Sequence, residues 1–395
     1  VEEYGYFRRS KGVCGSQEIT HMEQNNKSNK IWWVVTVIAI IVVIALFYDN
    51  KDKSIVKIGA VLALTGNNAS YGQDTQNGIN IALAELNKDG KQIEIVIEDD
   101  KSTAEGAVSA FRRIIDIEKL PIAIGFVSSN GILAVAPIAE SSKVVALSTL
   151  AGSDDVKNAG DYVFRIREKS ATHGEKMADY AKNILGAGKI ALYYANAANG
   201  ISYADAFKKR FEEIGGKIVY EGKYLEKSND FRSELSKIKA LLPDAIYLAG
   251  VGPDMGQILV QADELGIKTK WMASAGAENP KLVEIAKEKA EGLIFTTPAF
   301  NPNEDSDLVR KFTESYKQKY GVDPSFAAAN GYDGLMLVYD VIKKYGYSLE
   351  KIKEGLYATK DYSGVGGPFS FDGFGEVEKA IMFKVVKDGK FIKAE

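Results

Sequence analysis

The chain has 395 residues, 46% of them hydrophobic, and its formal net charge is -3. A chain of this length is expected to form about two or three domains with sizeable cores. The slightly acidic balance argues against a nucleic-acid partner, because binding to a phosphate backbone needs a basic face.

Cysteine and histidine are too scarce for several kinds of site. Cys14 is the only cysteine, which excludes an internal disulfide and a thiolate metal cluster. The two histidines are His21, in the N-terminal tail, and His173, which we expect on the surface of a helix. A zinc site built on histidines and a Cys–His dyad are therefore excluded, and we expect no metal, no cofactor and no enzymatic activity.

The N-terminal region contains one long apolar run. Residues 31–48 read IWWVVTVIAIIVVIALFY, in which Thr36 is the only polar side chain before the terminal Tyr48. As a helix this run is about 27 Å long, close to the thickness of a bilayer core. We interpret it as an uncleaved transmembrane signal anchor. The alternative is a cleaved signal peptide, whose apolar run is shorter and ends in small residues.

The tail before the apolar run covers residues 1–30. A short tail followed by a long domain is the usual layout of a signal anchor, so we expect the tail inside the cell and the chain after Asn50 outside, as a membrane-anchored extracytoplasmic domain. Met22 opens the segment MEQNNKSNK, which is typical of the start of a signal sequence. We hypothesise that translation starts at Met22 and that residues 1–21 are not translated.

From Ser54 onward, short β-branched runs alternate with amphipathic helical patterns, and the alternation starts again after residue 188. Strand–helix–strand alternation predicts parallel sheets covered by helices on both faces. The fold class is therefore α/β, with two doubly wound parallel-sheet lobes. The predicted strands are 55–62, 93–97, 121–125, 143–148, 189–194, 217–224, 244–250, 270–274 and 292–298.

Two local patterns concern acidic residues and turns. Asp99 and Asp100 end a predicted strand, and Ser102 with Glu105 reads as a capping box for the next helix. Paired carboxylates can do acid–base work, but no nucleophile or basic partner is close in sequence, so we interpret Asp100 as structural. At the C-terminus, Asp388-Gly389 predicts the turn of a β-hairpin.

Several stretches in a fixed order resemble a known family. These are IGAVLALTGNNASYGQDTQNGINIA (58–82), EDDKSTAEGAV (98–108), IGFVSSNGILAVAP (124–137), PDMGQILVQADELGIKTKWM (253–272) and GGPFSFDGFGEV (366–377). Together they resemble the type I periplasmic solute-binding proteins, in the branch of the leucine/isoleucine/valine-binding proteins. The resemblance covers essentially all of residues 54–395.

The resemblance implies two lobes joined by three crossovers, with a ligand cleft between them. Lobe 1 is expected at 54–168 and 297–380, and lobe 2 at 169–296 and 381–395. Closure about the hinge captures a small ligand (an amino acid, an amide or a short carboxylate) for an ABC permease in the membrane. The alternative is a membrane-tethered sensor that signals through a separate partner.

One candidate group of site residues is Ser128, Ser129 and Asn130, which follow a predicted strand and open a helix. A hydroxyl beside free backbone N–H groups at a helix start suits a carboxylate, although the same residues also serve as plain N-caps. The resemblance implies that Ser129 grips the ligand carboxylate.

The loop from Leu150 through Ala151 and Gly152 to Ser153 matches the second ligand loop of the family. Gly152 stands where the family has a threonine whose hydroxyl helps to hold an amino acid, so that hydroxyl is missing unless Ser153 replaces it. A tight turn that needs glycine is the equally open structural interpretation.

The resemblance also implies that Tyr71 lines the side-chain wall of the pocket and that Tyr203 closes over the ligand. Val251 and Ala275 match the positions of an aromatic and an acidic side chain that usually surround a ligand ammonium. Glu278, three residues after Ala275, is the remaining candidate for that charge. The class of small ligand is therefore implied, whereas an α-amino acid is not.

Overall fold

The computed structural model describes residues 32–40 and 55–394, and these belong to two separate units, 1–54 and 55–395. Residues 32–40 form a helix in which the Thr36 hydroxyl donates to the Trp32 carbonyl at 2.7 Å. Among the described residues, no helix combines the length and the apolar character that crossing a bilayer requires. Ile31, residues 41–48 of the expected span, the tail 1–30 and the start at Met22 lie outside the described residues.

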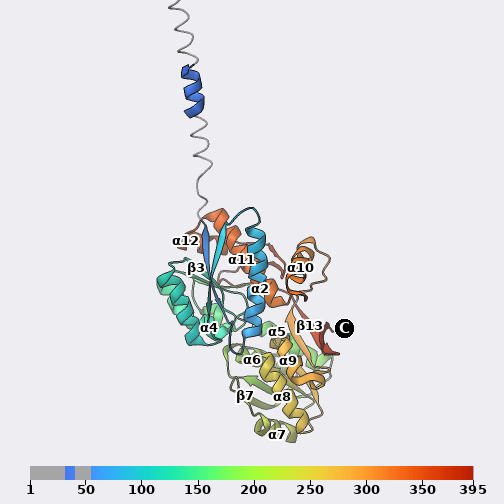
Figure 1. Ribbon diagram of the computed structural model, residues 1–395. Helices are drawn as coiled ribbons and strands as arrows, with labels where there is room; N and C mark the ends of the chain where they lie inside the picture. The colour runs from blue at the N-terminus through green and yellow to red at the C-terminus, as the bar shows by residue number, and fades with distance from the viewer. Residues whose placement is uncertain (1–31, 41–54, 395) are drawn as a thin grey trace, which may run out of the picture. The chain divides into compact units, whose positions relative to one another are not determined.

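The first sheet of the unit 55–395 has five parallel strands in the order β2-β1-β3-β4-β5. Figure 1 shows this sheet with α4 and α2 beside it. Its strands and helices, in chain order, are β1 (Val56–Leu62), α2 (Ala69–Leu86), β2 (Ile93–Asp99), α3 (Ala104–Arg112), η1 (Arg113–Ile117), β3 (Ile122–Gly125), α4 (Ser129–Ser142), β4 (Val145–Ser148), η2 (Asp154–Asn158) and β5 (Val163–Arg165).

The second sheet has seven strands in the order β14-β13-β10-β9-β8-β6-β7, parallel from β7 to β10 and antiparallel beyond β10. Its strands and helices are α5 (Ser170–Asn183), β6 (Lys189–Ala195), α6 (Ala198–Glu213), β7 (Lys217–Tyr224), α7 (Arg232–Ala240), β8 (Ala245–Ala249), α8 (Gly252–Glu264), β9 (Lys270–Ala273), η3 (Ala275–Ala277), α9 (Pro280–Ala286), η4 (Lys287–Ala290), β10 (Ile294–Pro298), β13 (Ile381–Lys387) and β14 (Lys390–Lys393).

Within residues 55–394 the chain passes between the two sheets three times: after β5, after β10 and before β13. Between the last two passages, three helices and a two-stranded ribbon return to the first sheet, where α11 packs along α2 (Figure 1). These elements are α10 (Asp307–Tyr320), α11 (Phe326–Tyr345), α12 (Leu349–Tyr357), β11 (Tyr362–Gly364) and β12 (Gly367–Phe369). The expected lobe boundaries stay a prediction, although each expected change of lobe falls near one of these passages.

Both sheets are buried on two faces, and successive strand residues alternate between the two cores. On β3, Ile122 and Ile124 pack in the core with α2 and α11, whereas Ala123 packs with α3 and α4. On β6, Tyr193 and Tyr194 likewise point into different cores. A parallel strand that is covered on both faces must be apolar at every position, and this explains the continuous apolar runs in the sequence. The predicted α/β fold with doubly wound parallel sheets is confirmed.

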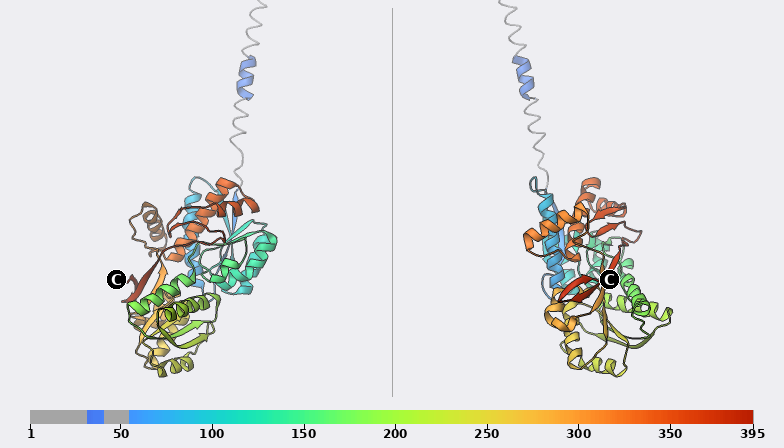
Figure 2. Two further views of the ribbon diagram at one scale, coloured as in Figure 1. Left: turned by 180° about the vertical axis from the view of Figure 1, so that it is seen from behind. Right: turned by 90° about the vertical axis from the view of Figure 1, so that its right-hand side faces the viewer.

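The predicted C-terminal hairpin is also confirmed. Lys387 of β13 pairs with Lys390 of β14, and the two turn residues between them, Asp388 and Gly389, have φ values of 51° and 69°. Such positive φ values define the tight turn that an Asp-Gly pair favours. The hairpin continues the second sheet beside β10, as both views in Figure 2 show near the C-terminus.

The predicted capping box is wrong by one residue. Thr103, not Ser102, is the N-cap of α3, and its hydroxyl accepts the N–H of Gly106 at 2.9 Å. Ser102 has a φ of 58°, outside the extended region that an N-cap adopts. Its hydroxyl instead donates to the Thr65 carbonyl at 2.6 Å and ties two loops together. Asp100 accepts the N–H of Ser102 at 2.7 Å, in keeping with a structural role.

Candidate functional site

The strand orders of the two sheets create one crevice each. In the first sheet, β2 lies on one side of β1 and β3 on the other, so the connections after β1 and after β3 leave in opposite directions. In the second sheet, β7 and β8 flank β6 in the same way. Loops separate at such a reversal point, and the carboxyl ends of the strands there are the usual place for a ligand.

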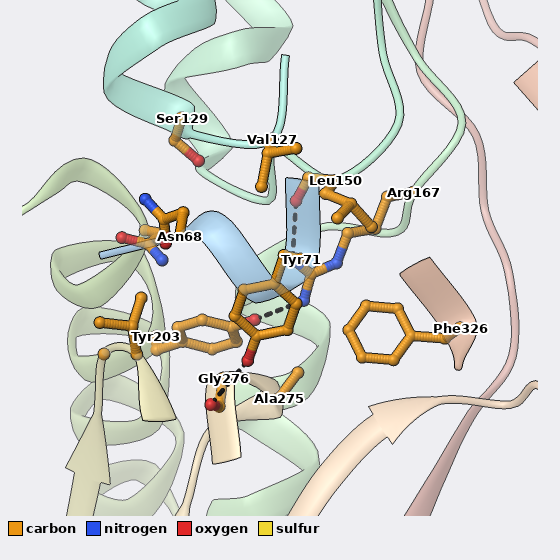
Figure 3. Close-up of a pocket in the computed structure, with 13 residues that line it drawn as sticks. Asn68, Tyr71, Val127, Ser129, Leu150, Arg167, Tyr203, Ala275, Gly276 and Phe326 are labelled. Atoms are coloured by element: carbon orange, nitrogen blue, oxygen red, sulfur yellow. Dashed lines mark hydrogen bonds between the residues drawn. The ribbon is translucent and has the colours of Figure 1, made fainter. Parts of the chain in front are cut away.

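A pocket lies where these two crevices meet (Figure 3), and the space free of protein atoms there, part of which is open to solvent, is about 420 Å³. Its walls come from both sheets, mostly from the segments that follow β1, β3, β4 and β5 on one side and β6, β8 and β9 on the other. The lining residues are Asn68, Tyr71, Val127, Ser129, Leu150, Arg167, Asn199, Tyr203, Gly250, Val251, Ala275, Gly276 and Phe326.

Hydrogen bonds cross directly between the two sides of the pocket. The Tyr71 hydroxyl, on α2, donates to the carbonyl of Gly276 at 2.7 Å (Figure 3). Asn130, on α4, accepts the N–H of Ala198 at the start of α6 at 3.1 Å. Asn279 donates to the Ser70 hydroxyl at 2.8 Å. The two sides are therefore held together in a closed arrangement.

Ser129 is joined to the loop that was predicted to share its ligand. Its hydroxyl accepts the backbone N–H groups of Gly152 and Ser153, each at 3.1 Å. Ser128 is the N-cap of α4 but makes no side-chain capping bond. The hydroxyl of Ser153 lies 3.1 Å from that of Ser202 on α6 and thus connects the loop to the opposite side.

The structure brings six of the eleven predicted site residues into the wall of the pocket. Five others do not line it: Ser128, Asn130, Ala151, Gly152 and Ser153. Ala151, Gly152 and Ser153 are buried outside the pocket wall, and Asn130 accepts a hydrogen bond from Ala198 across the cleft. The six that line it are Tyr71, Ser129, Leu150, Tyr203, Val251 and Ala275.

Sequence reasoning missed Arg167, the only charged side chain among the lining residues. Arg167 is 7% exposed, and it donates from Nη1 to the Leu150 carbonyl at 2.7 Å and from Nη2 to the Tyr203 hydroxyl at 2.6 Å (Figure 3). The signal in the sequence was VFRIR, in which arginines follow an apolar strand at its carboxyl end. Asn68, Val127, Asn199, Gly250, Gly276 and Phe326 were missed as well.

A buried acid and a histidine lie behind Arg167. The Arg167 Nε lies 3.5 Å from Oε1 of Glu168, which also contacts His173 Nε2 at 2.6 Å. The expectation of a surface histidine is wrong: His173 is 0% exposed, because α5 packs along α6. Burial lowers the pKa of His173 despite the neighbouring Glu168.

These contacts keep Arg167 and Glu168 ionised. Burial by itself would raise the pKa of Glu168, but His173 and Arg167 outweigh it and lower that pKa to about 2. Burial likewise opposes the charge of Arg167, but Tyr203 and Glu168 outweigh it and raise the pKa of the guanidinium. The pocket therefore presents a positive charge whose acidic partner, Glu168, is not part of the pocket wall.

Glu278 does not supply the missing acid. Its Oε1 accepts from Lys384 Nζ at 2.6 Å, its other oxygen accepts the Thr297 hydroxyl, and it does not line the pocket. Within residues 32–40 and 55–394, no group of three or more His, Cys, Asp or Glu side chains could hold a metal ion. The site can therefore bind a small molecule through one cation, hydroxyl groups and apolar surface.

Two α/β lobes that share one pocket define a two-lobed ligand-binding protein. Residues 55–390 match the periplasmic binding protein family, so the chain belongs to that family. The resemblance to the type I solute-binding proteins of the branched-chain amino acid branch is thereby confirmed, as is the general function of solute binding.

Individual relatives are similar over nearly the whole unit. A Leu/Ile/Val-binding protein homolog 2 of Brucella abortus is 25% identical over 361 residues, which cover 85% of this chain and 92% of that protein. The crystal structure of the leucine-binding protein LivK from Thermotoga maritima is 32% identical, covers 86% of this chain and 98% of its own, and has a TM-score of 0.83. An ABC-transporter solute-binding protein from Rhodopseudomonas palustris, in complex with 3,4-dihydroxybenzoic acid, is 26% identical, covers 86% and 95%, and has a TM-score of 0.76.

Proposed function

We propose that this protein captures a small solute outside the cytoplasm by closing its two lobes and delivers it to an ABC permease. The observation that carries the proposal is the pocket wall, which takes residues from both sheets. A ligand in such a pocket contacts both lobes only when they are closed, so its binding free energy favours the closed form. A permease that recognises the closed form then receives loaded protein.

The ligand is an amino acid, an amide or a short carboxylate. The two kinds of ligand in the names of the relatives, leucine and 3,4-dihydroxybenzoic acid, both carry a carboxylate. We propose that Ser129 and the loop 150–153 hold the polar end of the ligand, while Tyr71 and Tyr203 cover its body from the two lobes. Val251 and Ala275 leave the side of lobe 2 small and uncharged.

We also propose that residues 31–48 anchor the protein in the membrane. Support comes from the composition of this run and from the helix over 32–40. A tether of this kind raises the effective concentration of the binding protein beside its permease. The tethered sensor gains no support from the three relatives described above, whose names concern binding and transport.

A thermal-shift screen of the full-length chain in mild detergent tests the proposed capture. The compounds are amino acids, their amides and small organic acids. A ligand that binds only the folded protein raises its unfolding temperature by mass action. We expect at least one of the three classes to do so, and a flat response to all three would contradict the proposal. Genes for a permease and an ATPase beside this gene, rather than for a kinase, would favour transport over sensing.

A further inference from the structure

We propose that the preferred ligand is an anion without a cationic group, namely a carboxylate on an apolar or aromatic body, and that Arg167 binds its negative charge. This inference rests on the proposed function and specifies the chemistry of its ligand. It is carried by the position of Arg167 in the pocket wall, by the lack of an acidic side chain in that wall and by the apolar residues around it.

Arg167 retains hydrogen-bonding capacity that the protein does not use. A guanidinium has two N–H bonds on each terminal nitrogen. Among residues 55–394, Nη1 donates to the Leu150 carbonyl and Nη2 to the Tyr203 hydroxyl, which leaves one N–H bond on each nitrogen without a protein acceptor. Nε is buried and has no hydrogen-bond partner, although it lies 3.5 Å from Glu168. A planar pair of free donors suits a carboxylate.

The pocket is unfavourable for the ammonium group of an amino acid ligand. An amino acid bound here would place its ammonium in a pocket that already holds a guanidinium and whose lining residues include no carboxylate. Ala275 occupies the position where an acid is expected in amino acid binders, and both oxygens of Glu278 are engaged with Lys384 and Thr297. Desolvation and like-charge repulsion therefore both disfavour a zwitterion.

The rest of the wall carries no charge, and one part of it is apolar or aromatic. The rings of Tyr71 and Phe326 lie 6.2 Å apart between centroids, and Arg167 Cζ lies 5.9 Å from the centroid of Phe326 (Figure 3). Val127 and Val251 complete this surface from the two lobes. An aromatic ring or a branched aliphatic group would fit this surface, with the carboxylate directed at the guanidinium.

Matched pairs of probes test the inference by titration calorimetry on the full-length chain. Leucine is compared with 4-methylpentanoate, and phenylalanine with 3-phenylpropanoate; each pair differs only by the ammonium. Benzoate is compared with benzamide, which lacks the charge. In the pair that contains the tightest-binding compound, we expect the acid to bind at least about tenfold more tightly than the matched amino acid or amide.

The outcomes separate this inference from the proposed function. Tighter binding of leucine, phenylalanine or benzamide than of the matched acids overturns the inference and leaves solute capture intact. The inference is also overturned if none of the three acids binds. If, in addition, no compound of the thermal-shift screen raises the unfolding temperature, the proposed function fails as well. These comparisons use the unaltered protein, so they do not depend on whether any variant folds.

Two substitutions extend the test to the residues themselves. Arg167→Gln should weaken binding of the tightest acid by about tenfold or more, whereas Arg113→Gln, which removes an exposed arginine paired with Glu98 at 3.0 Å, should leave it unchanged. Ala275→Glu should weaken the acids and improve leucine or phenylalanine. If Arg167→Gln folds and binds the acids as tightly as the unaltered protein does, Arg167 is not the anion-binding residue.

Discussion

Gly152 lies directly against the guanidinium of Arg167. A Cβ atom at position 152 would come within 3.4 Å of Arg167 Nη1 and 2.6 Å of the Ser170 hydroxyl oxygen. The resemblance implies a threonine at this position, and the Ser170 hydroxyl occupies the space that the Cβ of such a residue would need. A side chain at position 152 would therefore overlap Ser170 and would come into van der Waals contact with the guanidinium of Arg167.

The first prediction concerns this contact. Gly152→Ala should lower the free energy of unfolding by about 1–3 kcal/mol, because the new methyl group overlaps Ser170 Oγ in a buried site. The Ser170 hydroxyl is buried and has no hydrogen-bond partner, so Ser170→Ala removes the clash without breaking a bond. The double variant should therefore recover most of the loss, measured by urea unfolding of the four proteins as a double-mutant cycle.

A matched glycine provides the control for this cycle. A Cβ at Gly373 would meet nothing within 4 Å, and its backbone is not in the left-handed region. Gly373→Ala should therefore be neutral or slightly stabilising, since alanine reduces the conformational freedom of the unfolded chain. Additive effects of Gly152→Ala and Ser170→Ala would show that the two sites do not interact and would contradict the described contact.

The second prediction concerns closure. Tyr71→Phe removes the hydrogen bond from α2 to the Gly276 carbonyl without changing the apolar surface of the ring. We expect the strongest ligand of the screen to bind about 2- to 10-fold more weakly, because the closed form loses a bond that the open form does not make. Titration calorimetry measures the change.

Tyr247→Phe is the control for the loss of a tyrosine hydroxyl. The Tyr247 hydroxyl is buried in the second sheet and makes no hydrogen bond. Its removal should leave affinity unchanged and stability equal or higher, because no partner loses a bond. If both phenylalanine variants bind equally well, the Tyr71–Gly276 bond makes no contribution to closure.

Much of the fold was predictable because its signals are local. Each buried strand is a short apolar run between amphipathic helices. The pair Asp388-Gly389 predicts a tight turn because both residues readily adopt positive φ values. The one-residue error at Thr103 arose because Ser102 and Thr103 offer the same hydroxyl. Only the backbone angles decide which of them caps the helix, and these depend on contacts with Thr65.

The site was less predictable because it depends on contacts between residues that are far apart in the sequence. Tyr71, Ser129 and Tyr203 were identified through resemblance to the family, but Arg167 departs from that pattern and stands beyond the end of a strand with no local motif. The predicted surface position of His173 is wrong for a related reason. A lone histidine in a polar helix gives no sign that Glu168 and α6 bury it.

The third prediction concerns Ser129. Its hydroxyl accepts two backbone N–H groups of the loop 150–153, so Ser129→Ala leaves both donors without this acceptor in a buried site. We expect a loss of about 1–3 kcal/mol in the free energy of unfolding. Ser141→Ala, at the exposed end of the same helix, should change stability little. An unchanged urea midpoint for Ser129→Ala would contradict the role of Ser129 in holding this loop.

The fourth prediction is a pH dependence that comes from Asp100. This carboxyl is 1% exposed, and burial, with a further contribution from the neighbouring Asp99, raises its pKa from 3.8 to about 6. A folded-state pKa above the unfolded value means that the protonated group stabilises the fold. That contribution is complete below about pH 3.8 and is lost as the pH rises through about 6.

Asp100→Asn should therefore be more stable than the unaltered protein at pH 8, by up to about 3 kcal/mol, because asparagine cannot ionise yet can still accept the Ser102 N–H. Near pH 4 the two proteins should differ little. Asp99→Asn is the matched control, and its effect should have the opposite sign. Burial raises the pKa of Asp99, but hydrogen bonds from Thr65, Lys101 and Leu64 outweigh burial and lower that pKa. This variant should therefore lose more stability at pH 8 than at pH 3. Urea unfolding across this pH range measures both variants, and a stability difference for Asp100→Asn that does not change with pH would show that Asp100 titrates normally.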